Sequence, residues 1–228
     1  MGGDERANVV RGDELHLVEG RLRWTRAHAS EFTIARDIKA RSRFGGHRSG
    51  SDFEMTRAVA LLRAVNVGGR SLAMGEVRAI FSDAKCDEVQ TYIQSGNVVF
   101  SSRRALGPSF TKAIERAIAE RTGFRVDVII RSNDELFEIL RKNPFPKSTH
   151  PKVHIAFLRG ESSSSTVDAL RGFQGEQEEY ALGPRVIYLH LPHGFGRAKL
   201  PPLVARLEPT STVRSLRTVQ KLLELTST

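Results

Sequence analysis

The sequence has few of the features that mark disulfide-rich, membrane or secreted proteins. One cysteine, Cys86, in 228 residues excludes an internal disulfide. No apolar run approaches the ~20 residues that a membrane-spanning helix needs. The N-terminus also lacks a basic segment followed by an apolar one, which is the pattern of a secretory signal. We therefore expect a cytoplasmic protein that does not associate with a membrane, and a single reduced cysteine suits that location.

The motifs that define many enzymes are also missing. We find no P-loop or dinucleotide-binding pattern and no G-x-S-x-G motif or Ser/His/Asp order. His190 and His193 have no cysteine or carboxylate at metal-ligand spacing, so we expect neither a metal nor a cofactor. Cys86 has no histidine near it in the sequence and is expected to be a structural thiol. No residue stands out as a nucleophile or general base, so the sequence leaves open whether the protein is an enzyme.

What the sequence does have is an excess of positive charge, with a formal net charge of +9 at pH 7. Residues 1–54 hold 10 Lys+Arg against 9 Asp+Glu, whereas residues 55–228 hold 25 against 17. The excess therefore lies in the second region. An anionic partner would fit it, such as a nucleotide, a phosphorylated metabolite or a nucleic acid. A solvated arginine-rich surface would explain it as well.

The two regions also differ in pattern. Residues 1–54 have only short apolar stretches, at 15–18 and 32–34, and they end in a stretch rich in Arg, Gly and Ser at 41–51. Such a composition is typical of flexible, solvated chain. We expect residues 1–54 to form a flexible extension with at most a short hairpin or helix. Met55 is an alternative start of the native protein.

From Met55 onward, apolar periodicity and turn residues predict strand, helix, strand, strand, helix, strand, helix. The predicted elements of this first round span 58–62, 74–81, 89–93, 98–100, 110–121, 126–130 and 132–142. The same order recurs over 153–158, 166–170, 179–182, 186–189, 201–207, 211–213 and 216–225. We therefore divide this region into two modules, 55–146 and 147–228.

Three local matches suggest that the second module repeats the first. The segments 59–64, 92–100 and 130–132 resemble 155–160, 180–188 and 213–215, so the offset falls from 96 to 88 to 83 residues. No single match is specific, but all three keep the same order. We predict an α+β fold made of tandem duplicated ferredoxin-like βαββαβ modules, each followed by an extra helix.

Several strings in this region resemble a bacterial domain-of-unknown-function family, number 1697. They are Ala60 to Gly69, Met74 to Arg78, Thr91 to Phe100, Ile187 to His190, Gly194 to Leu200 and Thr218 to Leu223. The resemblance covers residues 55–228 and implies a two-part α+β fold, but no established activity. This chain departs from the family pattern at Ala64, where glycine is usual, and at Ser215-Leu216, where Asn-Trp is usual.

Three loops have residues suited to a ligand. In the first, glycines after a strand let backbone N–H groups converge on an anion, with arginines to add charge. In the second, the hairpin 94–97 offers amide side chains suited to a base, sugar or amide edge. In the third, cations stand just before a helix that begins near Pro201-Pro202. Each loop has an alternative reading as an ordinary turn with solvated side chains. The candidate ligand-binding residues are Arg63, Asn66, Gly68, Gly69, Gln94, Ser95, Asn97, Arg197, Lys199 and, as an outer contact, Arg214.

Three functions follow from these features. The first is binding of a small anionic ligand, a nucleotide or phosphorylated metabolite, in a cleft between the modules. The second is nucleic-acid binding, in which a ferredoxin-like sheet stacks bases on exposed aromatics, although no RNP-like string is present. The third is a structural role in which the sheets form a homodimer.

Overall fold

The computed structural model describes residues 55–65, 71–94, 96–175 and 177–227, together with two short strands near the N-terminus. These strands, β1 (His16–Val18) and β2 (Arg21–Arg23), pair in antiparallel fashion. The chain divides into two units, Met1–Asp52 and Phe53–Thr228. The prediction that residues 1–54 form a flexible extension falls almost entirely outside the described residues. No helix in the described part of the chain is long and apolar enough to span a membrane.

The second unit contains the repeated order of elements that its sequence predicts. The elements of the first module are β3 (Thr56–Leu62), α2 (Met74–Asp83), β4 (Asp87–Tyr92), β5 (Asn97–Ser102), α3 (Pro108–Thr122), β6 (Val128–Ser132) and α4 (Asn133–Arg141). Those of the second module are η1 (Lys147–Lys152), β7 (Val153–Phe157), α5 (Ser164–Arg171), β8 (Glu179–Gly183), β9 (Val186–His190), η2 (Phe195–Arg197), α6 (Leu200–Leu207), β10 (Thr212–Ser215) and α7 (Leu216–Ser227).

Local signals place the two extra helices, α4 and α7, directly after the fourth strand of each module. Ser132 and Glu135 have the spacing of a capping box, and this box is present at α4, where Ser132 accepts from the N–H of Glu135 and the Glu135 carboxylate accepts from the N–H of Ser132. At α7 the Ser215 hydroxyl accepts from the N–H of Thr218. An N-cap of this kind stabilises a helix by about 1 kcal/mol.

The two modules form similar four-stranded antiparallel sheets, which confirms a mixed α+β fold with six α-helices among the described residues. The strand orders are β4-β5-β3-β6 and β10-β7-β9-β8, so the first strand of each module lies between its third and fourth. The pairing registers also correspond, because Val59 pairs with Arg131 just as Ile155 pairs with Arg214.

These registers correct one of the three local matches. Tyr188 pairs with Ile155, and the residue that pairs with Val59 is Val99. Val99 therefore takes the position of Tyr188, whereas the sequence match assigned that position to Phe100. The turn between paired Tyr92 and Asn97 has four residues, whereas the turn between paired Gly183 and Val186 has two, so no single offset fits both strands of the hairpin.

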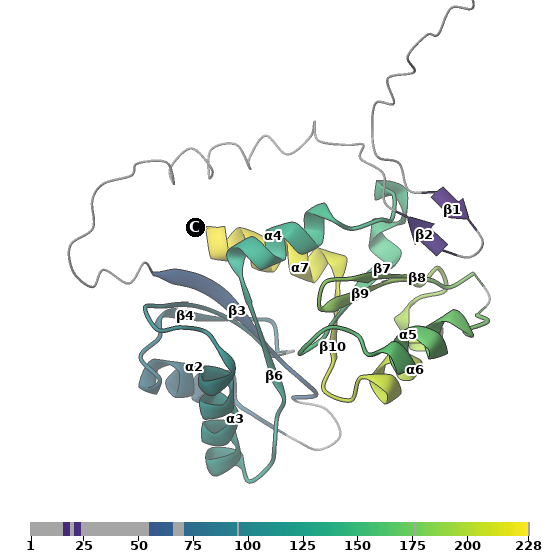
Figure 1. Ribbon diagram of the computed structural model, residues 1–228. Coiled ribbons are helices and arrows are strands. Elements are labelled where there is room, and N and C mark those ends of the chain that lie inside the picture. The colour runs from purple at the N-terminus through teal and green to yellow at the C-terminus, as the bar shows by residue number, and fades with distance from the viewer. Residues whose placement is uncertain are drawn as a thin grey trace, which may run out of the picture. The chain divides into compact units, whose positions relative to one another are not determined.

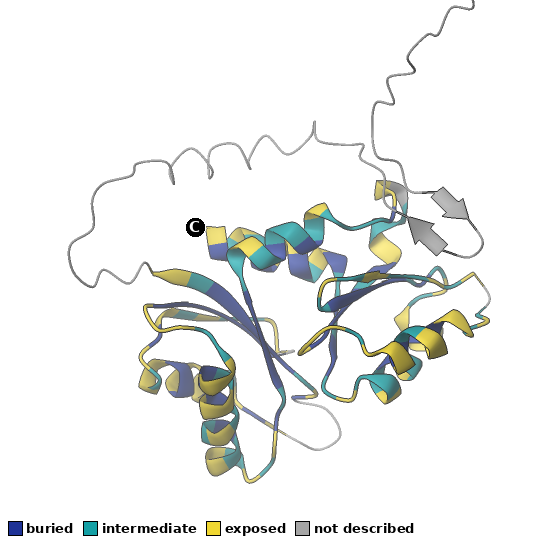
Figure 2. Cartoon of the chain, in the orientation of Figure 1, coloured by how far each residue is buried: buried dark blue, intermediate teal, exposed yellow. Residues whose placement is uncertain are grey.

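Hydrophobic side chains pack into three clusters that alternate with the two sheets. Figures 1 and 2 show the helices layered on the sheets and the buried residues along the strands. Helices α2 and α3 cover the outer face of the first sheet, and α5 and α6 cover the outer face of the second. The inner faces of both sheets share one core with α4 and α7. Strand alternation produces this division, since Val59 and Leu61 face the shared core while Ala58, Ala60 and Leu62 face the α2–α3 side.

Two buried arginines connect the modules reciprocally. Arg131 on β6 donates from Nη2 to the carbonyls of Leu158 at 2.6 Å and Arg185 at 3.0 Å, both in the second module. Arg214 on β10 donates from Nη2 to the carbonyls of Leu62 at 2.9 Å and Gly96 at 3.4 Å, both in the first. Burial lowers the pKa of each arginine to about 10, so both remain protonated at pH 7.

We predict that Arg131→Ala lowers the free energy of unfolding by about 3 kcal/mol. The substitution leaves a cavity and leaves the buried Leu158 carbonyl without its charged donor. Urea denaturation would measure the loss. Arg116→Ala is the matched control, because the Arg116 side chain on α3 is 77% exposed and its removal should change stability by less than ~0.5 kcal/mol. Equal stability of the two variants would contradict a structural role for Arg131.

Candidate functional site

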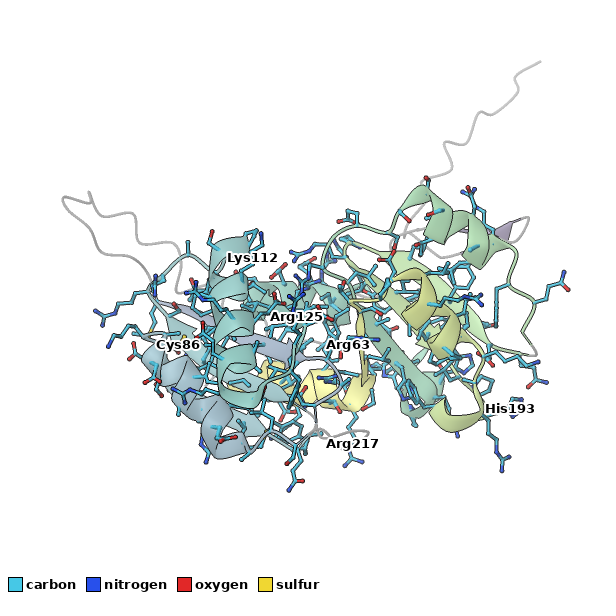
Figure 3. The ribbon with its side chains drawn as sticks, turned by 90° about the horizontal axis from the view of Figure 1, so that it is seen from below. Arg63, Cys86, Lys112, Arg125, His193 and Arg217 are labelled. Atoms are coloured by element: carbon cyan, nitrogen blue, oxygen red, sulfur yellow. The ribbon has the colours of Figure 1, made fainter. Side chains whose placement is uncertain are left out.

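Arg63 stands at the end of β3, where the two modules meet (Figure 3). Its backbone N–H donates to the carbonyl of Asp127 at 2.9 Å, which holds it within the first module. Its side chain reaches the second module, where Nε donates to the carbonyl of Ser211 at 3.0 Å. Arg63 as a whole is half-buried.

Asn97 and Arg214 join the two modules next to Arg63, because Arg214 also donates to the carbonyl of Leu62, the residue before Arg63. The Arg214 Nε donates to Asn97 Oδ1 at 2.6 Å, and Asn97 Nδ2 donates to the carbonyl of Tyr92 at 3.1 Å. Both side chains are buried, with Asn97 at 0% and Arg214 at 9% exposure. They connect the β4–β5 hairpin to β10, and their burial keeps them from contacting a ligand directly.

Gly96 brings this hairpin close to the end of β3. It adopts φ 74°, and a Cβ at this position would lie 2.5 Å from Val65 Cγ2 and 2.9 Å from Leu62 Cβ. No other residue fits there without displacing the chain. Gln94, two residues earlier, is exposed. The structure thus gathers Arg63, Gln94 and Asn97 around one turn.

The rest of the first loop lies outside the described residues. This is true of Asn66, Gly68 and Gly69, and also of Ser95 in the hairpin. Ala64 is described, and it adopts φ 51°. This left-handed conformation costs a residue with a Cβ roughly 1 kcal/mol. Glycine avoids that cost, which explains why the family pattern has glycine at this position.

The third loop does not offer the helix terminus that the sequence suggests for an anion. Glu178 accepts hydrogen bonds from the backbone N–H of Lys199 at 2.8 Å and of Leu200 at 2.8 Å. The start of α6 is therefore already occupied by a carboxylate of the protein itself.

Arg197 and Lys199 are also separated from Arg63. Their loop leaves β9 at His190, which pairs with Val153 at one end of β7. Arg63 contacts the carbonyl of Ser211. The next residue, Thr212, pairs with Phe157 at the other end of β7. Four residues of strand span about 14 Å. Figure 3 agrees, with Arg63 near the middle of the view and His193 at its edge. The candidate residues thus form two groups rather than one.

The two four-stranded sheets leave no exposed face for base stacking in the manner of an RRM domain. Phe100 and Tyr188 are 1% and 2% exposed, because helices or the opposite sheet cover both faces of each sheet. Tyr92 and Tyr180 are half-buried and pack against the same clusters.

A comparison with protein families finds one whose model matches residues 55–188, described as "Protein of unknown function (DUF1697)". The chain belongs to this family. The match covers the first module and the second as far as Tyr188, so the family-like strings after His190 lie beyond it.

This DUF1697 protein also resembles a solved structure, that of a conserved bacterial protein from Streptococcus pneumoniae. The two share 18% sequence identity with a TM-score of 0.64, over 77% of this chain and 100% of the other. That likeness supports the fold alone. No curated protein matches the chain.

Sequence reasoning missed Arg131, Arg159 and Glu178 as structural contacts of the DUF1697 fold. Arg131 was noted only as part of a repeated string, and its burial on an edge strand has no local signal. Among the described residues, no group of three or more His, Cys, Asp or Glu side chains is arranged to hold a metal ion.

Cys86 is 6% exposed and packs in the cluster between the first sheet and helices α2 and α3. Burial, reinforced by the neighbouring Asp87 carboxylate, raises the pKa of its thiol to about 11. A thiol with this pKa is a poor nucleophile at neutral pH, which agrees with the structural role expected from the sequence.

We predict that Cys86 in the native protein reacts with a disulfide reagent at pH 8 at least ~100-fold more slowly than in urea. At pH 8 only about 0.1% of a thiol with pKa 11 is ionised, against roughly a quarter of an unperturbed one. The rate should rise about tenfold per pH unit towards pH 11. Absorbance of the released thiol would follow it, and fast native labelling would contradict the burial.

Proposed function

We propose that the protein binds a small anionic ligand, a nucleotide or phosphorylated metabolite, at the module interface beside Arg63. Arg63 supplies the charge, Gln94 supplies an exposed amide, and Asn97 with Arg214 holds the turn in place. Arg197 and Lys199 are not part of this site, because Glu178 occupies the nearby helix terminus.

The observation that supports this proposal is a difference between two equivalent arginines. Arg63 lies four residues after Val59, and Arg159 lies four residues after Ile155, which has the same register in the second sheet. Both reach across to the other module. Arg159 forms ion pairs there with Glu115 and, at 3.3 Å, with Asp127.

Arg63 has no such carboxylate partner among the described residues. Thr210 stands four residues before Arg214, where the other module has Asp127 four residues before Arg131. Arg63 therefore meets a backbone carbonyl through Nε, and neither Nη group has a partner in the described part of the chain. Two parallel N–H donors suit the paired oxygens of a phosphate or carboxylate. An external anion would take the place that Glu115 and Asp127 hold beside Arg159.

We predict that Arg63→Ala weakens binding of a phosphorylated ligand by at least about tenfold, since a hydrogen bond to a charged group contributes ~1.5–3 kcal/mol. Thermal shift with adenosine monophosphate, glucose 6-phosphate and inorganic phosphate would first identify a ligand, and titration calorimetry would measure the change. Arg116→Ala removes the same charge from an exposed site and should bind normally.

A second pair of variants tests whether a carboxylate at position 210 prevents Arg63 from binding an anion. Thr210→Asp introduces the carboxylate that the first module has at Asp127, so it should neutralise Arg63 and abolish anion binding. Thr210→Asn has the same shape without the charge and should bind almost as the wild type. The proposal fails if no anion stabilises the wild type at millimolar concentration, or if Thr210→Asp binds as well as Thr210→Asn.

We also propose that the modules are two copies of one ferredoxin-like βαββαβ unit with an added helix, divided between residues 146 and 147. The common strand order, the matching registers and the reciprocal arginines Arg131 and Arg214 support this proposal.

A further inference from the structure

A pocket of about 180 Å³ lies at the edge of the shared core, beside the start of β3, whereas Arg63 follows the end of that strand. It is lined by Arg57, Glu88, Gln90, Val99, Ser101 and Leu225. These residues come from β3, β4, β5 and the C-terminal part of α7. None of them belongs to the proposed anion site.

The equivalent corner of the second module is filled by the protein's own rings. By register, Tyr188 takes the position of Val99, and His190 takes that of Ser101. Tyr188 is 2% exposed, and its hydroxyl donates to the carbonyl of Ile139 on α4 at 2.8 Å. The ring of Phe145 lies 5.5 Å from that of His190 and closes the corner.

The pocket therefore corresponds to space that aromatic side chains occupy in the other module. The first module has Val99 where the second has Tyr188, and Ser101 where the second has His190. This corner of the first module therefore lacks two rings. Cavities of about 150 Å³ accept a benzene-sized ring. The first module thus has room for a single ring.

The remaining wall is polar, which decides what kind of ring would bind. Glu88 Oε2 accepts from Arg57 Nη2 at 2.9 Å and from the Ser101 hydroxyl at 2.8 Å. Glu88 Oε1 has no partner among the described residues. The Glu88 backbone adopts φ 52° in the β4 bulge, a conformation that costs a non-glycine residue about 1 kcal/mol or more and that recurs at ligand sites.

We infer that this pocket binds a small neutral aromatic ring bearing an amino group. The ring would occupy the space that corresponds to Tyr188 and pack against Val99 and Leu225. Its N–H group would donate to Glu88 Oε1. A neutral donor suits the site better than a cation, because Arg57 already balances the charge of Glu88.

The test is an NMR titration of the full-length protein with 2-aminopyrimidine, with toluene and cyclohexylamine as comparison probes. We predict saturable shifts of the Val99 and Ser101 backbone amides with 2-aminopyrimidine at millimolar concentration. Toluene lacks the donor and cyclohexylamine lacks the ring, so both should bind at least tenfold more weakly.

Two variants locate the binding. Val99→Tyr restores the side chain of the second module and should abolish the shifts. Glu88→Gln keeps the shape of a partly exposed side chain but loses the carboxylate, so it should weaken binding by about tenfold even if Val99→Tyr folds poorly. Arg63→Ala should have no effect, which separates this site from the anion site. Absence of saturable shifts in the wild type would overturn the inference, as would unchanged binding by Glu88→Gln.

Discussion

The structure of the folded unit depends on burying one arginine from each module against backbone carbonyls of the other. Moving a guanidinium out of water costs several kcal/mol, so the arrangement is stable only where its N–H groups find acceptors. Arg131 and Arg214 meet that condition through Leu158 and Arg185 on one side and Leu62 and Gly96 on the other. Neither arginine finds these partners in its own module, so the hydrogen bonds form only when the modules are docked.

Docking also explains the position of the two extra helices. A four-stranded sheet with helices on one face leaves its other face apolar and needing cover. Here the two uncovered faces meet in one core together with α4 and α7, and residues such as Leu136, Val219 and Leu222 fill it. A fully buried leucine or valine stabilises the fold by ~1.5–3 kcal/mol, so this shared core gives the docked pair much of its stability.

Because the modules are so similar, the places where they differ point to function. The equivalent arginines Arg63 and Arg159 differ in whether a carboxylate neutralises them. The equivalent corners at Val99 and Tyr188 differ in whether a ring fills them. In both cases side chains or backbone groups of the protein satisfy the position in the second module, whereas the equivalent position in the first module has no matching carboxylate or ring among the described residues.

The sequence by itself determined the order and approximate bounds of the strands and helices, the capping box at Ser132 and the recurrence of one order of elements in both modules. These are local signals, set by apolar periodicity, turn residues and hydrogen bonds within a few positions. Only the tertiary structure decided which side chains meet. Arg63 contacts Ser211, Arg214 contacts Asn97 and Glu178 reaches α6, through partners that lie far along the chain or in the other module. The distance between Arg197 and Arg63 could not be predicted for the same reason. The residues of a loop do not show at which end of β7 that loop lies. Contacts between distant segments depend on strand order and docking, and no short pattern encodes these.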